Sequence, residues 1–266
     1  MTTNATAETA TSFQQKLDSV QAFVMGHVKN SNTFSLPYLH IELPVYLSMH
    51  ALMVVLAATL LIVLFGIVYR KRDPVPTGIT NLLEMFVVFV RDEISVRFLG
   101  EKDGIRMAPL FCSFFFFILT MNLIGLVPCF AAATGNLSVT AALALVTFGF
   151  MILGGIIKTG PIGFLKGFIP SGLPWPLAVF MFPIEVFGVL IKAGALMIRL
   201  FANMLSGHMV LFFMLGMICI FGLYALPVIA LGVLVYIIEL FVAFLQAYVF
   251  TLLSAIFIGQ RYHPEH

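Results

Sequence analysis

Five long runs of apolar residues dominate the chain, and short polar or Gly/Pro-rich segments separate them. The runs cover residues 46–69, 107–130, 137–157, 176–222 and 227–258. A helix of about 20 apolar residues is long enough to cross the hydrocarbon core of a bilayer. The pattern therefore predicts an all-α polytopic membrane protein with five membrane helices.

Two segments outside these runs follow other patterns. Residues 78–100 mix Leu, Phe and Val with five charged side chains, which favours one amphipathic helix lying at the membrane interface. Residues 1–44 are polar with scattered charge, and no basic segment leads into a short apolar run. We therefore expect a polar tail with room for one amphipathic helix, no cleaved signal peptide, and a single integral membrane domain over residues 45–266.

The last two runs are longer than a bilayer requires. Residues 176–222 would form a helix about 70 Å long, and no polar break divides this run near its middle. We therefore expect one long, strongly tilted helix, packed antiparallel against 227–258 after a turn at Gly222–Pro227. Lipid alone gives no reason for such a tilt, so a protein partner is the expected cause.

Composition supports the membrane interpretation. The chain has 266 residues, of which 61% are hydrophobic and 10% are charged, against about a quarter charged in soluble domains. These values exclude an ordinary soluble enzyme, a disordered chain and a nucleic-acid-binding protein. Three cysteines at irregular spacing favour neither a disulfide framework nor a zinc site, and no phosphate-binding loop is present. We expect no metal and no cofactor.

The basic residues alternate between loops and predict an orientation. Residues 70–106 carry Lys and Arg, and the predicted Gly/Pro-rich loop 158–174 carries Lys158 and Lys166, whereas the loops 131–136 and 222–226 carry no charge. Because cytoplasmic loops are enriched in Lys and Arg, this pattern predicts that the N-terminal tail lies outside and the C-terminus lies in the cytoplasm.

Four charged side chains interrupt the last two apolar runs: Glu185, Lys192, Arg199 and Glu239. His208 adds a further ionisable group. A charge at mid-bilayer costs about 2.5–3.5 kcal/mol on insertion scales, so such residues face protein or water and are functional candidates.

Helical geometry predicts how these residues pair. Glu185, Lys192 and Arg199 are each seven residues apart, and at about 100° per residue they share a stripe that Asn203 continues. Counted from the turn, His208 and Glu239 are equally distant, so they can be neighbours. By the same count Gln246 reaches nearly the depth of Arg199.

Each candidate residue also has an explanation in which it serves only the structure and takes no part in function. Lys192 can extend to the cytoplasmic surface, Glu185 can pair locally, and Asn203 and Gln246 can simply bond between helices. His208 can pack against another helix. The other histidines, His50 among them, form no recognisable constellation and are assigned no role.

Arg199 is the hardest of these residues to explain structurally, because no acidic residue lies three or four positions away. His208 and Glu239 can relay protons, whereas arginine stays protonated. A fixed cation between two ionisable stations blocks direct proton flow and attracts a carboxylate. This chain has no such carboxylate at that depth, so another chain is expected to supply it.

At this point the residues resemble a known family. The segment Arg199-Leu-Phe-Ala-Asn-Met-Leu-Ser-Gly-His208 closely resembles the signature of subunit a of the F-type ATP synthase. Residues 122–128, 135–145 and 239–246 resemble its other segments. The resemblance covers about 106–258, is weaker over the first apolar run, and does not extend to the tail.

The resemblance implies a non-catalytic, proton-translocating subunit in the plasma membrane of a bacterium. Its partners would be a ring of c subunits, each with a membrane carboxylate, the b subunits of the peripheral stalk, and the lipid bilayer. Arg199 would face the ring, with Asn203 and Gln246 close to it. His208 and Glu239 would line an outer half-channel, and Glu185 a cytoplasmic one.

Two other classes of function are compatible with the pattern. A free-standing proton-coupled transporter would bind its substrate inside this chain and would work without a ring. A purely structural anchor for other subunits would tolerate the loss of Arg199. Neither H⁺ nor Na⁺ as the coupling ion follows from this chain alone.

Overall fold

The computed structural model describes most of the chain after residue 48. The described residues are 14, 15, 18, 33–36, 39–42, 49–68, 78–127, 130, 132–168, 175–221 and 226–262. The rest of the N-terminal tail, the basic run at 70–72, the predicted turn at 222–225 and the last four residues lie outside this set.

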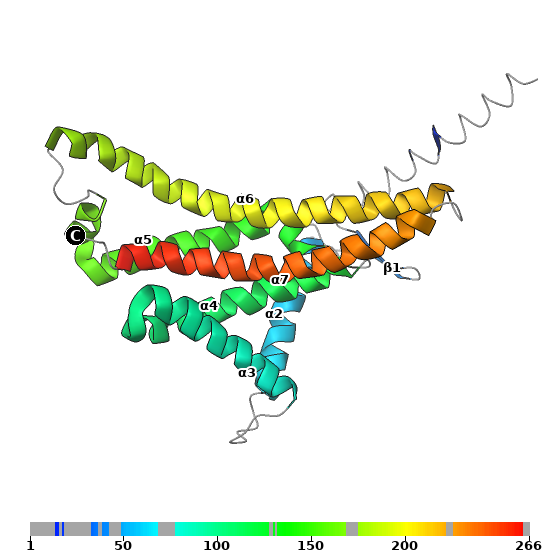
Figure 1. Cartoon of the computed structure of the whole chain (residues 1–266), viewed down its shortest axis with the longest axis horizontal. Coiled ribbons are helices and arrows are strands. Elements are labelled where there is room, and N and C mark those ends of the chain that lie inside the picture. The colour runs from blue at the N-terminus through cyan, green and yellow to red at the C-terminus, as the bar shows by residue number, and fades with distance from the viewer. Residues whose placement is uncertain are drawn as a thin grey trace, which may run out of the picture.

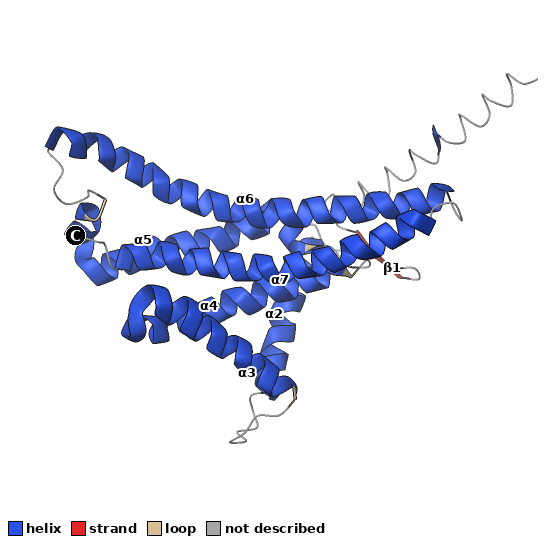
Figure 2. Cartoon of the chain, in the orientation of Figure 1, coloured by secondary structure: helices blue, strands red, loops and turns tan. Residues whose placement is uncertain are grey.

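Five helical segments are long and apolar enough to cross a membrane, which confirms the predicted fold class. They contain α2 (Met49–Val68), α4 (Arg97–Leu126), α5 (Leu137–Lys166), α6 (Trp175–Phe221) and α7 (Leu226–Tyr262). Figure 1 shows that α4 to α7 run along the long axis of the molecule, with α6 and α7 antiparallel. Helices dominate the described part (Figure 2).

The predicted surface helix is a separate arm that folds back on α4. It consists of α3 (Ile79–Phe89) and a π-helical segment, η1 (Val90–Val96). The chain bends at Gly100, where φ is 77° and ψ is 168°, a conformation that glycine adopts without steric cost. The arm then packs against α4, and the Ser95 hydroxyl donates to the Gly104 carbonyl oxygen at 2.6 Å.

The C-terminal part of α5 corrects the sequence-based expectation. Residues 158–174 were predicted to form a loop, but 158–166 continue α5 as a helical segment. Gly160, with φ of 76° and ψ of 162°, bends the chain there. Pro161 directly follows the bend, where it can occupy the first turn of a new helical segment because that turn needs no donor from its nitrogen.

Two short strands lie in the N-terminal tail, where only a helix had been considered. β1 (Thr33–Leu36) and β2 (Leu39–Glu42) are antiparallel, with Thr33 opposite Glu42. Polar and apolar residues alternate in both segments, as is typical of strands. A further short 3₁₀ turn, η2 (Ala133–Gly135), precedes α5.

α7 is the helix around which the others assemble, because it packs against α4, α5 and α6. On its α4 side, the rings of Phe114 and Phe250 meet edge to face at 5.8 Å, and the buried Asn122 amide donates to the Ala243 carbonyl oxygen at 3.3 Å. These contacts bring the C-terminal end of α4 to the α6–α7 hairpin, where the predicted polar residues lie.

Candidate functional site

Four polar contacts link α6 to α7 along the hairpin. From the turn towards the C-terminus they are His208–Glu239 at 3.0 Å, Asn203–Gln246 at 2.7 Å, Lys192–Gln260 at 3.0 Å and Glu185–Arg261 at 2.8 Å. Because the helices are antiparallel, the first two contacts lie at separate depths, and the last two lie close together because Gln260 and Arg261 are neighbours. The predicted proximity of His208 and Glu239 is confirmed, and we name these two residues the outer pair.

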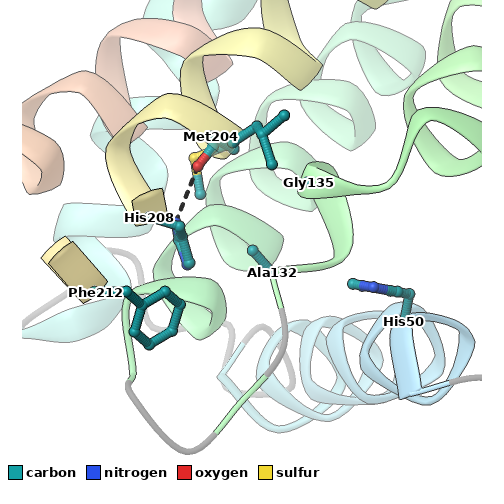
Figure 3. Close-up of a pocket in the computed structure, with 7 residues that line it drawn as sticks. His50, Ala132, Gly135, Met204, His208 and Phe212 are labelled. Carbon is teal, nitrogen blue, oxygen red and sulfur yellow. Dashed lines mark hydrogen bonds between the residues drawn. The ribbon is translucent and has the colours of Figure 1, made fainter. Parts of the chain in front are cut away.

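The outer pair is buried and is supported by α4. The side chains of His208 and Glu239 are 12% and 5% exposed. Nε2 of His208 lies 2.8 Å from the carbonyl oxygen of Gly125, and its Nδ1 lies 3.0 Å from that of Met204. Figure 3 shows the Met204 contact within α6. Three helices therefore position one imidazole ring.

These contacts favour a particular protonation state of His208. A carbonyl oxygen only accepts hydrogen bonds, so two such bonds require a proton on each ring nitrogen. A doubly protonated imidazole carries a positive charge, and the Glu239 carboxylate at 3.0 Å can balance it. The geometry thus fits an imidazolium beside a carboxylate, with no net charge for the pair.

Glu239 is the less well bonded member of the outer pair. Both carboxylate oxygens are buried, and neither has a hydrogen-bond partner in the described part of the chain. Nδ1 of His208 lies 3.0 Å from Oε1 of Glu239 and equally close to the Met204 carbonyl oxygen, so the contact with Glu239 is a close charge contact. A buried polar atom without a hydrogen bond is costly, so a water molecule beside this carboxylate would stabilise it.

A glycine makes room for this carboxylate. A Cβ atom at Gly207 would lie 2.5 Å from Oε1 of Glu239 and 2.9 Å from its carboxyl carbon. Any side chain at this position would push the carboxylate away. Small residues allow membrane helices to approach closely. A glycine directly before His208 in a long apolar run was therefore the sequence signal that could have identified Gly207.

Arg199 differs from the paired residues because it is exposed on α6. Its guanidinium forms no ion pair among the residues that the structure describes. Gln246, which was expected near the depth of Arg199, is 3% exposed and accepts a hydrogen bond from Asn203. Large apolar side chains on the same helix are exposed, such as Ile198 at 57%. The cation therefore lies on an apolar surface without a partner in this part of the chain.

The contact at the other end of the hairpin was only half predicted. Glu185 had been identified, but its partner Arg261 had not been considered a site residue. Arg261 is 7% exposed and donates to Glu185 and to the carbonyl oxygen of Gly167 at 3.2 Å. Its guanidinium also lies 4.2 Å from the ring centre of Phe168. We name Glu185 and Arg261 the inner pair.

Lys192 extends towards the C-terminal end of α7. Its ammonium group donates to Gln260 on α7 at 3.0 Å and lies 5.7 Å from the ring centre of Phe257.

Sequence reasoning also missed His50, which α2 brings close to the outer pair. No group of three potential metal ligands occurs among the described residues.

These features define an integral membrane protein that buries ionisable groups between its two longest helices. The family model of the ATP synthase A chain matches residues 51–259. The chain belongs to this family.

Relatives cover most of the chain. It is 46% identical over 228 residues to the ATP synthase subunit a of Myxococcus xanthus, a match that covers 82% of this chain and 75% of the relative. It is 39% identical over 264 residues to that of Chloroherpeton thalassium, covering 95% and 79%. The match to the subunit of Anaeromyxobacter dehalogenans is 45% identical and spans 79% of this chain but only 56% of that relative.

Proposed function

We propose that this chain is the proton-channel subunit a of a rotary, F-type ATP synthase. It would provide two offset half-channels that load and unload the carboxylates of a c-subunit ring. ATP chemistry would occur on other subunits, so this chain would be non-catalytic. The observation that carries the proposal is Arg199, an exposed cation on an apolar helix face that has no ion-pair partner among the described residues.

The outer half-channel would pass through the outer pair. A proton from outside would add to the buried Glu239 carboxylate, where His208 and Glu239 share one site. From there it would reach a ring carboxylate near Asn203 and Gln246. Because both members of the pair can change protonation state, they suit the loading of a proton.

The cytoplasmic half-channel would contain Glu185. Its side chain is 37% exposed, so it is open to water or to a partner. Arg199 would stand between the two half-channels and hold the passing ring carboxylate ionised, since a nearby cation favours the charged form of an acid. The transmembrane potential supplies about 2.3 kcal/mol per charge per 100 mV, and a leak past Arg199 would dissipate it.

The orientation proposed here puts the N-terminal tail outside and the C-terminus in the cytoplasm of a bacterium, with b subunits and lipid as further neighbours. Labelling a single cysteine introduced by Leu137→Cys, in a cysteine-free background, tests it. Reagent added from the outside should label that position. Labelling only from the cytoplasmic side would contradict the orientation.

The decisive experiment replaces Arg199 by alanine in the assembled complex. We expect Arg199→Ala to abolish proton-driven ATP synthesis while the membrane sector still conducts protons passively. Lys192→Met removes a different cation from the same helix and should retain most of the activity. Near-normal coupled synthesis in Arg199→Ala would reject the proposal, and substrate transport by the isolated chain would instead indicate a free-standing transporter.

A further inference from the structure

A small cavity lies beside the outer pair, where α2 approaches α6. Its volume is about 20 Å³, and its lining includes His50, Ala132, Gly135, Met204, His208 and Phe212. In Figure 3, His50 comes from α2 and His208 from α6, and the loop that carries Ala132 lies between them. A buried water needs roughly 10–15 Å³ of such space, so the cavity has room for one water molecule.

His50 has the properties of a group that binds water or protons at this cavity. Its side chain is 5% exposed, and its Nδ1 atom is buried without a hydrogen-bond partner among the described residues. The ring has a backbone hydrogen bond with Ala132. Leaving a buried polar atom unpaired costs roughly 1–3 kcal/mol, so a water in the cavity is the natural partner for Nδ1.

Few other titratable groups surround His50. No other residue of α2 can change its charge, and neither η2 nor the last turns of α4, which contain Asn122 and Gly125, bring a charged group. On α6, His208 shares the cavity, and Glu239 lies directly behind it. The cavity therefore connects two imidazoles, and its described lining contains no other charged side chain.

We propose that His50 is a further proton-carrying residue of the outer half-channel and that it exchanges protons with His208 and Glu239 through one water in this cavity. The inference rests on the proposed function of the outer pair. His50 is the second residue of α2, at the helix end that the proposed orientation puts at the outer surface. Among the described residues of this path, it would thus be the one nearest the outer end.

The proton balance is simple. A proton from the outer aqueous side adds to one ring nitrogen of His50. The cavity water accepts a proton from the ring of His50 and gives one of its own protons to His208, which lines the cavity, as His208 passes its own proton to Glu239. His50, the water and His208 thereby return to their starting states. An imidazole suits this role because its unperturbed pKa lies close to neutral pH.

The test is His50→Gln in the complete complex, in inverted membrane vesicles whose lumen corresponds to the outside. ATP synthesis after an acid–base transition is measured with the lumen set between about pH 5 and pH 8, where an imidazole titrates. Thr59→Val is the matched control, because this exposed hydroxyl on α2 bonds only to the Val55 carbonyl oxygen of its own helix.

We expect His50→Gln to lower the synthesis rate by about tenfold, which is less than the 10²–10⁴ typical of direct proton transfer in catalysis, because the cavity still conducts some protons. The profile against lumen pH should also lose one titration step. His50→Glu should restore part of the rate, since a carboxyl group can also take up and release a proton. Should the Gln variant fail to assemble, the same comparison is made between His50→Glu and His50→Asn.

Two results would overturn the inference. One is a rate and a profile equal to those of Thr59→Val, and the other is a lower rate with an unchanged profile shape, which would mean that His50 only packs. Arg199→Ala in the same vesicles separates this failure from a failure of the proposed function. If Arg199→Ala abolishes synthesis while His50→Gln is neutral, only the role of His50 is rejected.

Discussion

Two charge pairs connect α6 and α7, one on each side of Arg199 along the hairpin, and they differ in composition. The outer pair joins His208 to Glu239, so both partners can gain or lose a proton. The inner pair joins Glu185 to Arg261, and the arginine stays protonated under all ordinary conditions. The outer pair therefore has two members of a kind that can relay protons, whereas the inner pair has only one, Glu185.

The surroundings of the two pairs differ in the same direction. Both members of the outer pair are buried, and neither oxygen of Glu239 has a hydrogen-bond partner within the described ranges. In the inner pair, Glu185 is partly exposed, while Arg261 also bonds to Gly167 and stacks on Phe168. The inner pair thus fixes the ends of three helices in addition to placing a carboxylate near the surface.

The largest expected effect concerns the shared site of the outer pair. His208→Ala and Glu239→Ala should each slow proton uptake from outside strongly, without opening a leak, because Arg199 remains. The double variant that combines His208→Glu with Glu239→His should be more active than the less active of the two single variants His208→Glu and Glu239→His. The double variant keeps one imidazole and one carboxylate at the same depth. The measurement is ATP-driven proton pumping in inverted vesicles.

If the losses of pumping rate in the two single variants add up, on a logarithmic scale, to the loss in the double variant, His208 and Glu239 act independently. Residues in one network normally show interaction energies of about 0.5–3 kcal/mol in double-mutant cycles. A coupling within that range supports a shared proton site. If this coupling energy is absent, His208 and Glu239 do not form a shared proton site, and the proposed difference between the outer and inner pairs is rejected.

A more local change tests the position of Glu239. In Gly207→Ala the new Cβ would lie 2.5 Å from the carboxylate, so Glu239 must withdraw from His208, and the pumping rate should fall severalfold. Adding Glu239→Asp shortens the side chain by one methylene and should restore part of the lost rate. Gly149→Ala is the control, because a Cβ there would meet nothing within 4 Å.

If Gly207→Ala pumps as well as Gly149→Ala, close packing of the carboxylate is not required. Failure of Glu239→Asp to improve the Gly207→Ala variant would likewise argue against a steric cause.

The smallest expected effects lie at the inner pair. Glu185→Gln keeps an oxygen that can accept from Arg261 but removes the ionisable group, so it should lower pumping less than Glu239→Gln. Arg261→Gln should lower the thermal stability of the complex more than Glu185→Gln does, because it removes the bond to Gly167 and the contact with Phe168 as well. Pumping rates and thermal unfolding of the purified complexes check both statements. Equal effects of Glu185→Gln and Glu239→Gln on the pumping rate would contradict the proposed difference between the outer and inner pairs.

The parts of the fold that the sequence predicted are those determined by long local patterns. Apolar runs predicted all five membrane helices, and counting residues from the predicted turn brought His208 to Glu239. The same count put Gln246 near Arg199, whereas it bonds to Asn203 one turn away. A shift of a few residues is within the error of any count made through a turn.

The parts that could not be predicted depend on contacts between segments far apart in the chain. His50 lies at the start of α2, and only the packed helices bring it to the cavity beside His208. Arg261 was recognisable as a charge at the end of an apolar run, but not as the partner of Glu185. The continuation of α5 beyond Gly160 was missed because Gly-Pro reads as a loop signal, although the same dipeptide can bend a helix and restart it.

The most direct test of the central claim is the passive proton permeability of the membrane sector in Arg199→Ala, alone and combined with Glu239→Gln. If Arg199 separates two half-channels and the outer one passes through Glu239, the single variant should leak protons, and Glu239→Gln should suppress most of that leak. A leak of equal size in the double variant would mean that protons reach the Arg199 level by a route without Glu239. That result would contradict the outer half-channel described here.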